Sequence, residues 1–393
     1  MKRAAACLAM MLMLFTLSAA AESVTFVIPS AYGSRAASLP MEEGWFTWDS
    51  QYYNHGLARL SLGMAVSAFP GISGRKDAGI RAFLTSLGFG DVETAGYAFP
   101  GAVRTAAARR SVGSETVVAF VVGPGDNSWE ESLNLGVGAV HQGFSASAET
   151  AAARLRDYAA RHSLRGAKYW LAGFGGSGAV IGLAAERLIR DGFLLEQQLY
   201  AYTFASPRVS QNPVPCVSLF SIVSPGDALA LLPPAAWGYA RPGRTLALPS
   251  ARRPDAAALF QAYAAVLRQF SADGSGKDFS GMADAALREA ASRIGSRDDY
   301  RRLYQTPLTK LLSGRLLNAA ETIRVTALIS AVSKAVRTVS PGSLSASGAG
   351  ALLSAELHAL YLQHDPAVYA AWLLSLPDGN VLFDQSSTLT EGI

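Results

Sequence analysis

Apolar and polar residues follow two different periods along this chain. Residues 51–69 and 78–87 place apolar side chains at helical spacing, so both segments predict amphipathic helices. Residues 116–122 form an unbroken β-branched and apolar run that ends at a Gly-Pro-Gly sequence, which is typical of a buried strand. The same alternation continues with helices at 147–162 and 177–190 and strands at 168–172, 199–204 and 217–223. Strands that alternate with helices predict a mainly parallel sheet with helices on both faces.

The pattern and composition of the sequence change after Pro249. Segments rich in alanine and leucine with interleaved arginines replace the strand patterns, and they predict helices at 256–270, 282–294, 297–312 and 317–339. Residues 340–348 are rich in serine and glycine and predict a connection. A last helix at 351–362 leads to His364 and then to a short amphipathic tail.

The N-terminus has the pattern of an export signal. Lys2 and Arg3 precede the apolar run 4–17, which ends in Ser-Ala-Ala-Ala. This pattern predicts a signal peptide over residues 1–21 that is cleaved before Glu22. The alternative is an uncleaved membrane anchor, since the run approaches the roughly 20 residues that span a bilayer. No later segment is apolar over about 18 residues, so we expect an exported chain without a stable membrane span.

Charge and cysteine content narrow the classes of partner. The net charge of +4 falls to +2 once Lys2 and Arg3 are removed, and the remaining basic residues lie among acidic ones. A nucleic-acid partner is therefore not expected, because phosphate binding needs a concentrated basic face. Cys216 is the only cysteine left after cleavage, which excludes an intramolecular disulfide. Histidines and carboxylates show no metal-ligand spacing, so neither a metal nor another cofactor is expected.

Residues 173–178 are the most informative segment about function. They form a glycine-rich turn between a predicted strand and a predicted helix. Its glycines satisfy the G-x-G-x-x-G pattern of nucleotide-binding turns. The same place suits a nucleophile elbow, where a serine stands on a sharp strand-to-helix turn between small neighbours. For a dinucleotide, the strand 199–204 should end in an acidic residue, and it runs instead into Ala205-Ser206. A third alternative is a turn that only packs the helix tightly on the sheet.

The surrounding sequence resembles the fungal-type (class 3) lipases, in particular their bacterial exported members. The resemblance covers residues 52–249 and a further match near His364. The motifs that carry it, in the order of the family, are Tyr53-Asn54-His55, Val140-His141-Gln142-Gly143-Phe144, the glycine turn, Tyr202-Thr203-Phe204-Ala205-Ser206-Pro207-Arg208, Val223-Ser224-Pro225-Gly226-Asp227, Trp237-Gly238-Tyr239 and His364-Asp365-Pro366 with Tyr369. The resemblance implies an α/β-hydrolase fold and a lipid-like or apolar ester ligand.

The resemblance also implies roles for individual residues. Acyl transfer on this fold uses a nucleophile, an acid and a histidine in that chain order, and Asp227 and His364 stand in the second and third places. The elbow of the family reads Gly-His-Ser-x-Gly, which places Gly175 at the nucleophile position, where the serine is absent. Gly176 takes the position of the oxyanion amide. Pro124 takes the position of an oxyanion-binding threonine, and proline has neither a hydroxyl nor a backbone N–H.

Ser177 is the alternative nucleophile, because residues 175–179 read G-x-S-x-A. The competing interpretation is a serine in the first helical turn that bonds to a backbone N–H. Two helical residues past the elbow correspond to a rotation of about 200°, which directs the hydroxyl away from a histidine that faces Gly175. His55 and His141 lie outside the triad order, and we interpret them as structural.

Together these observations predict one α/β-hydrolase core over residues 22–250, a helical cap or side insertion over 251–350, and a C-terminal helix and tail over 351–393 that carries His364. The first hypothesis for function is a lipase-like protein with lost or much reduced ester hydrolysis. The alternatives are an active esterase that uses Ser177, His364 and Asp227, and a nucleotide-binding protein that uses the turn 173–178. The first hypothesis further predicts that His364 and Asp227 lie within hydrogen-bonding reach of one another, close to Gly175.

Overall fold

The computed structural model describes most of residues 22–250 and parts of the chain that follows. The described residues are 22–30, 34–69, 77–96, 103–125, 132, 134–250, 253–270, 280–294, 296–303 and 362–377. The predicted signal peptide 1–21, the predicted helix 317–339 and the connection 340–348 lie outside the described residues, as does nearly all of the predicted helix 351–362.

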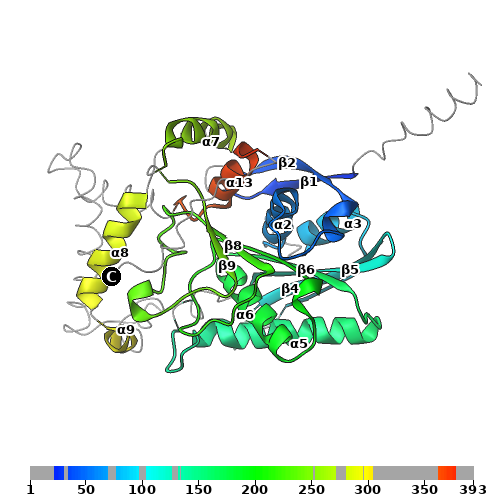
Figure 1. Ribbon diagram of the computed structural model, residues 1–393, viewed down its shortest axis with the longest axis horizontal. Helices are drawn as coiled ribbons and strands as arrows, with labels where there is room; N and C mark the ends of the chain where they lie inside the picture. The colour runs from blue at the N-terminus through cyan, green and yellow to red at the C-terminus, as the bar shows by residue number, and fades with distance from the viewer. Residues whose placement is uncertain are drawn as a thin grey trace, which may run out of the picture.

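A seven-stranded sheet in the order β3-β4-β5-β6-β7-β8-β9 forms the centre of the protein (Figure 1). The strands are β3 (Gly90–Gly96), β4 (Val103–Val112), β5 (Glu115–Pro124), β6 (Lys168–Phe174), β7 (Leu199–Phe204), β8 (Leu219–Val223) and β9 (Arg244–Ala247). Strands β5 to β9 are parallel to one another, whereas β3 and β4 add antiparallel pairs at the β5 edge. This is the mainly parallel sheet that the alternating pattern predicts, and it fits the α/β-hydrolase fold that the resemblance implies.

Helices cover both faces of the sheet, because its central strands are apolar on both sides. Helices α2 (His55–Ser67) and α3 (Ala78–Ser86) lie on one face, and α5 (Gln142–Arg161) and α6 (Gly176–Arg190) lie on the other (Figure 1). Along β5 the side chains alternate: Val117, Ala119 and Val121 join the first core, and Val118, Phe120 and Val122 join the second. Helix α2 begins later than the pattern predicts, because the Asn54 side chain accepts a hydrogen bond from the Leu57 amide at 2.8 Å and ends the preceding loop.

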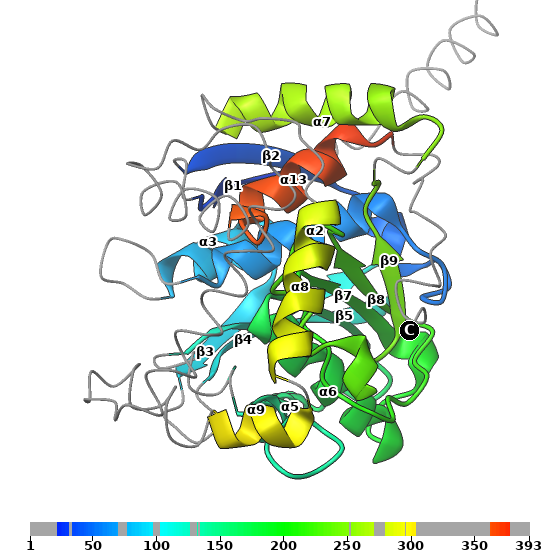
Figure 2. The same ribbon diagram turned by 90° about the vertical axis from the view of Figure 1, so that its left-hand side faces the viewer.

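The C-terminal part of the chain packs into the same core as the sheet. Helix α13 (Pro366–Ser375) lies against α7 (Ala256–Phe270) and near the hairpin of β1 (Glu22–Ile28) and β2 (Arg35–Met41) (Figure 2). The rings of Tyr263 and Trp372 stack with centroids 4.3 Å apart. For residues 366–375 the prediction of a short amphipathic tail is therefore wrong, while residues 378–393 lie outside the described residues. Helix α13 is apolar on nearly all sides because it is buried, and such a helix has no amphipathic period to detect.

Helix α8 (Ser280–Ile294) and helix α9 (Arg297–Leu303) lie at the edge of the sheet where the parallel strands end (Figure 2). On α8, Ala283 packs against Leu231 of the loop that follows β8. On α9, Arg297 donates to the Gln211 side chain and lies over the Tyr239 ring. Short 3₁₀ turns occur at Glu43–Phe46, Glu196–Gln198 and Ala235–Trp237. Among the described residues, no helix is both long enough and apolar enough to cross a bilayer.

Candidate active site

The glycine turn forms a sharp elbow between β6 and α6. Gly175 has φ +59° and ψ −131°, a backbone conformation that L-residues adopt only under strain. Its amide donates to the carbonyl of Phe204 on the neighbouring strand at 2.8 Å. A Cβ atom at Gly173 would lie 2.6 Å from the Ser177 carbonyl oxygen, so only glycine lets the helix turn back this closely on the strand. The turn thus has the geometry of a nucleophile elbow, with a glycine at its apex.

His364 and Asp227 meet at this elbow. His364 Nδ1 lies 2.8 Å from Asp227 Oδ2, although the two residues are 137 positions apart in the sequence. Asp227 follows β8 in a Pro-Gly turn, and His364 stands just before α13, whose N-terminus is capped by the Asp365 side chain. The structure therefore brings together the two side chains that the sequence places in triad order.

Four hydrogen bonds satisfy the Asp227 carboxylate, which is fully buried. Its Oδ1 accepts from the Leu229 and Ala230 amides at 3.0 and 3.1 Å. Its Oδ2 accepts from His364 and, at 2.7 Å, from the Tyr369 hydroxyl. These four donors compensate for the loss of water around the buried carboxylate. The sequence motif includes Tyr369, but only the fold reveals that its hydroxyl reaches Asp227, because Tyr369 lies on the helix that the sequence pattern did not indicate.

The Asp227 carboxylate also sets the electrostatics of His364. Burial lowers the pKa of the His364 imidazole, but the charge of Asp227 and its hydrogen bond outweigh burial, so the pKa is raised above 6.5. For Tyr369, burial and the same carboxylate raise the pKa well above its ordinary value, so its hydroxyl stays protonated and can donate. With Nδ1–H donating to Asp227, the neutral imidazole carries its lone pair on Nε2.

The second ring nitrogen of His364 faces Gly175. A Cβ atom built on Gly175 would lie 2.9 Å from His364 Nε2 and 3.5 Å from its Cε1. Real Cβ contacts are longer than 2.9 Å, so the imidazole occupies part of the space that a serine side chain needs. The Phe174 ring lies edge-on to His364 and to Tyr369, with centroid distances of 5.4 Å in both cases, and holds the imidazole over the elbow.

The described residues include both positions that the resemblance assigns to oxyanion binding. Gly176 is the first residue of α6, where backbone amides have no partner within the helix. Pro124 ends β5 beside Val103 and supplies no donor there. A Cβ atom at Gly176 would lie 3.1 Å from the Phe144 ring and 3.6 Å from Ser132 Oγ. The sequence did not single out Ser132, since it belongs to none of the motifs.

Ser177 is the second residue of α6 and is only 7% exposed. The backbone that faces His364 is that of Gly175, and at about 100° per residue Ser177 is rotated about 200° away from it. Among the described residues, the His364 imidazole therefore lies next to Gly175 and does not face Ser177.

The other two histidines of the lipase-like motifs are held by polar contacts of their own. His55 lies 2.9 Å from the Tyr53 hydroxyl through Nδ1 and 2.9 Å from the Leu373 carbonyl through Nε2. His141 Nε2 lies 3.2 Å from the Ser132 carbonyl, and burial lowers the His141 pKa to about 4. The described part of the chain contains no group of three or more His, Cys, Asp or Glu side chains that could hold a metal ion.

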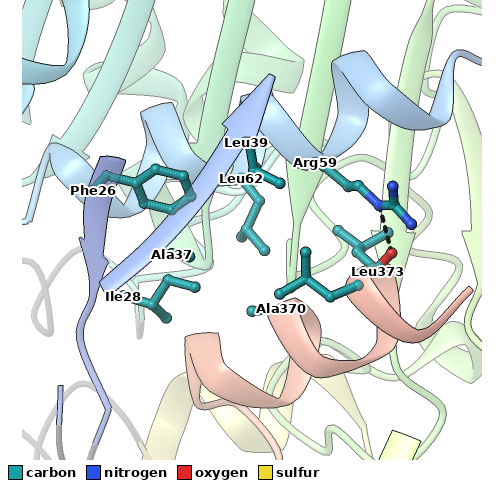
Figure 3. Close-up of a pocket in the computed structure, with 9 residues that line it drawn as sticks. Phe26, Ile28, Ala37, Leu39, Arg59, Leu62, Ala370 and Leu373 are labelled. Carbon is teal, nitrogen blue, oxygen red and sulfur yellow. Dashed lines mark hydrogen bonds between the residues drawn. The ribbon is translucent and has the colours of Figure 1, made fainter. Parts of the chain in front are cut away.

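An apolar pocket lies between the β1–β2 hairpin, α2 and α13, and Figure 3 shows its lining. Arg59 is the one charged residue of that lining, and its Nε donates to the Leu373 carbonyl at 2.8 Å. A second donation, to the Leu376 carbonyl, places this cation at the C-terminal end of α13, where it stabilises the helix. The pocket has no group that could do chemistry, and we interpret it as a gap in the packing.

Comparisons with known proteins give structural matches only. No family model matches the chain, and no curated protein matches it. Solved structures that match include the lipase from Rhizopus microsporus var. chinensis, with 21% identity over 49% of this chain and 72% of that one, at a TM-score of 0.36. The triacylglyceride lipase of Rhizomucor miehei matches with 20% identity over 49% of this chain and 78% of that one, at a TM-score of 0.36. Lipase II from Rhizopus niveus matches with 16% identity over 53% and 82%, at a TM-score of 0.34.

Proposed function

We propose that this chain is an exported, lipase-like α/β-hydrolase that has lost serine-dependent ester hydrolysis and binds an apolar ester or another lipid-like ligand at the elbow. One observation carries the proposal. The elbow has a strained backbone and faces a His364–Asp227 pair, but the residue at its apex is Gly175.

The loss of serine chemistry follows from the atoms at the elbow. Glycine has no oxygen that could attack a carbonyl and form an acyl-enzyme. The position of the imidazole agrees with this loss, since Nε2 lies 2.9 Å from where a Cβ atom would stand. Pro124 removes a further donor, and in known enzymes the loss of one oxyanion donor costs about 2.7–4 kcal/mol. Serine-dependent turnover is therefore expected to be absent.

Labelling with a fluorophosphonate probe tests this proposal, because only an activated serine reacts with it. We expect the unaltered protein to remain unlabelled under conditions that label an active serine hydrolase completely. Labelling that disappears in Ser177→Ala would contradict the proposal and establish the active esterase that uses Ser177, His364 and Asp227.

Ligand binding is tested separately by fluorescence of cis-parinaric acid, a fatty acid that becomes emissive in apolar surroundings. We expect saturable emission that a long-chain ester displaces and that NAD does not. Displacement by NAD alone would favour the nucleotide-binding alternative at turn 173–178. N-terminal sequencing of the exported product should begin near Glu22, and a product that retains Met1 and stays in the membrane would refute export by cleavage.

A further inference from the structure

The His364–Asp227 pair retains the parts of a general base even though Gly175 offers no hydroxyl. Nδ1 is engaged by Asp227 at 2.8 Å, so the imidazole is held in one orientation with the lone pair on Nε2. Among the described residues, no hydrogen-bond partner is found for Nε2. The side chain is 22% exposed, so water reaches the ring.

The geometry at Gly175 favours a water molecule over a side chain as the partner of Nε2. A serine must begin at a Cβ atom 2.9 Å from Nε2, which is too close for that atom. A water molecule has no covalent link to the backbone and can take an ordinary hydrogen-bond distance from the imidazole. We propose that His364, oriented by Asp227, activates water directly to hydrolyse a carboxylic ester bound over Gly175, without an acyl-enzyme. This inference rests on the proposed function, which supplies the ester-binding elbow.

His364 Nε2 takes a proton from water while the water oxygen forms a bond to the carbonyl carbon, and the carbonyl electron pair moves onto its oxygen. The Gly176 amide at the start of α6, which has no partner within the helix, would donate to this oxyanion. The intermediate then collapses, the bond to the alcohol oxygen breaks, and the leaving alkoxide takes the proton from the imidazolium. The products are a carboxylic acid and an alcohol, and His364 returns to its neutral form.

No other histidine of the lipase-like motifs can take this role. His55 has both ring nitrogens engaged, by Tyr53 and by a backbone carbonyl. His141 is 1% exposed and stacks on Phe144 at a centroid distance of 4.3 Å, so water does not reach its ring. Of the three, His364 is the one with an anchored Nδ1 and a partly exposed side chain.

Hydrolysis of methyl butyrate, followed by pH-stat titration of the purified protein, tests the inference. This ester has a poor leaving group, so it excludes simple attack by imidazole on an activated ester. General-base catalysis contributes about a hundredfold or more, so His364→Gln should lower the rate by at least that factor. Asp227→Asn should lower it as well, because the imidazole loses the charge that orients it. The matched control is His162→Gln, whose side chain has a similar exposure of 19%, bonds to Glu93 on β3 and should leave the rate unchanged.

The outcomes separate this inference from the proposed function. Turnover that is lost in His364→Gln, slows in D₂O and is accompanied by no fluorophosphonate labelling supports direct attack by water. Turnover equal in the unaltered protein and in folded His364→Gln overturns the inference, while binding of cis-parinaric acid still supports the proposed function. Fluorophosphonate labelling overturns both. Circular dichroism and thermal unfolding establish whether each variant is folded. If His364→Gln does not fold, the rate of Asp227→Asn tests the inference instead.

Discussion

Restoring a serine at the elbow should recover little catalysis by itself. In Gly175→Ser the new side chain stands at φ +59°, a conformation that costs an L-residue about 1–3 kcal/mol. Its Cβ atom would lie 2.9 Å from His364 Nε2, so the imidazole must move away. That movement lengthens the 2.8 Å hydrogen bond to Asp227. We expect lower stability and slow probe labelling.

A missing oxyanion donor should limit the catalytic rate that Gly175→Ser can recover. A new serine would form a tetrahedral intermediate that the amide of Gly176 can reach but that Pro124 cannot, since proline has no N–H. One missing donor costs about 2.7–4 kcal/mol, which corresponds to a hundredfold to a thousandfold in rate. Pro124→Thr together with Gly175→Ser should therefore gain more than the two single changes combined.

Burst kinetics with 4-nitrophenyl butyrate measures this directly, because an acyl-enzyme releases one equivalent of nitrophenol before steady turnover. Pro124→Thr alone is the control and should produce no burst. We expect no burst or a very slow one from Gly175→Ser and a clear burst from the double variant. A fast burst from Gly175→Ser alone would refute the reasoning about the oxyanion donor. Rapid turnover by the unaltered protein that Ser177→Ala abolishes would refute the loss of the nucleophile.

Three further predictions concern charges at the site and at β3. Asp227→Asn should lower the pKa of His364 below its present raised value, because burial then acts unopposed; an unchanged pKa in an NMR titration of the imidazole would contradict the assigned cause. Tyr369→Phe removes one hydrogen bond to the buried carboxylate and should cost about 1.5–3 kcal/mol in urea unfolding, with no measurable loss as the contrary result. Burial raises the pKa of Glu93, but its hydrogen bonds to a histidine and two arginines lower it to about 2, below the 4.5 of an unperturbed glutamate. The contribution of ionised Glu93 to stability is thus complete above about pH 4.5 and is lost as the pH falls towards 2. Glu93→Gln should lack this part of the fall in unfolding temperature with decreasing pH. If the unfolding temperatures of the variant and of the unaltered protein fall in parallel, the assigned role of Glu93 is wrong.

Local chemistry along the chain was enough to predict four of the five parallel strands and the glycine elbow, whereas β9 was not predicted. The strands β5 to β8 are β-branched or aromatic runs bounded by glycine and proline, and such runs are recognisable without tertiary information. The order of Asp227 and His364 after the elbow likewise follows from the sequence, and so does the absence of a hydroxyl at Gly175.

Elements without a local signal were decided by tertiary packing. Strand β4 reads VRTAAARRSV and shows no strand period, yet it pairs with β5 over its whole length. Helix α13 is buried on nearly all sides, so its apolar residues carry no helical period. Only the fold reveals that the Tyr369 hydroxyl completes the bonds of Asp227 and that the His364 imidazole lies over the Gly175 backbone. These contacts join segments more than 130 residues apart, and their distances depend on how helix and sheet pack, which no local pattern encodes.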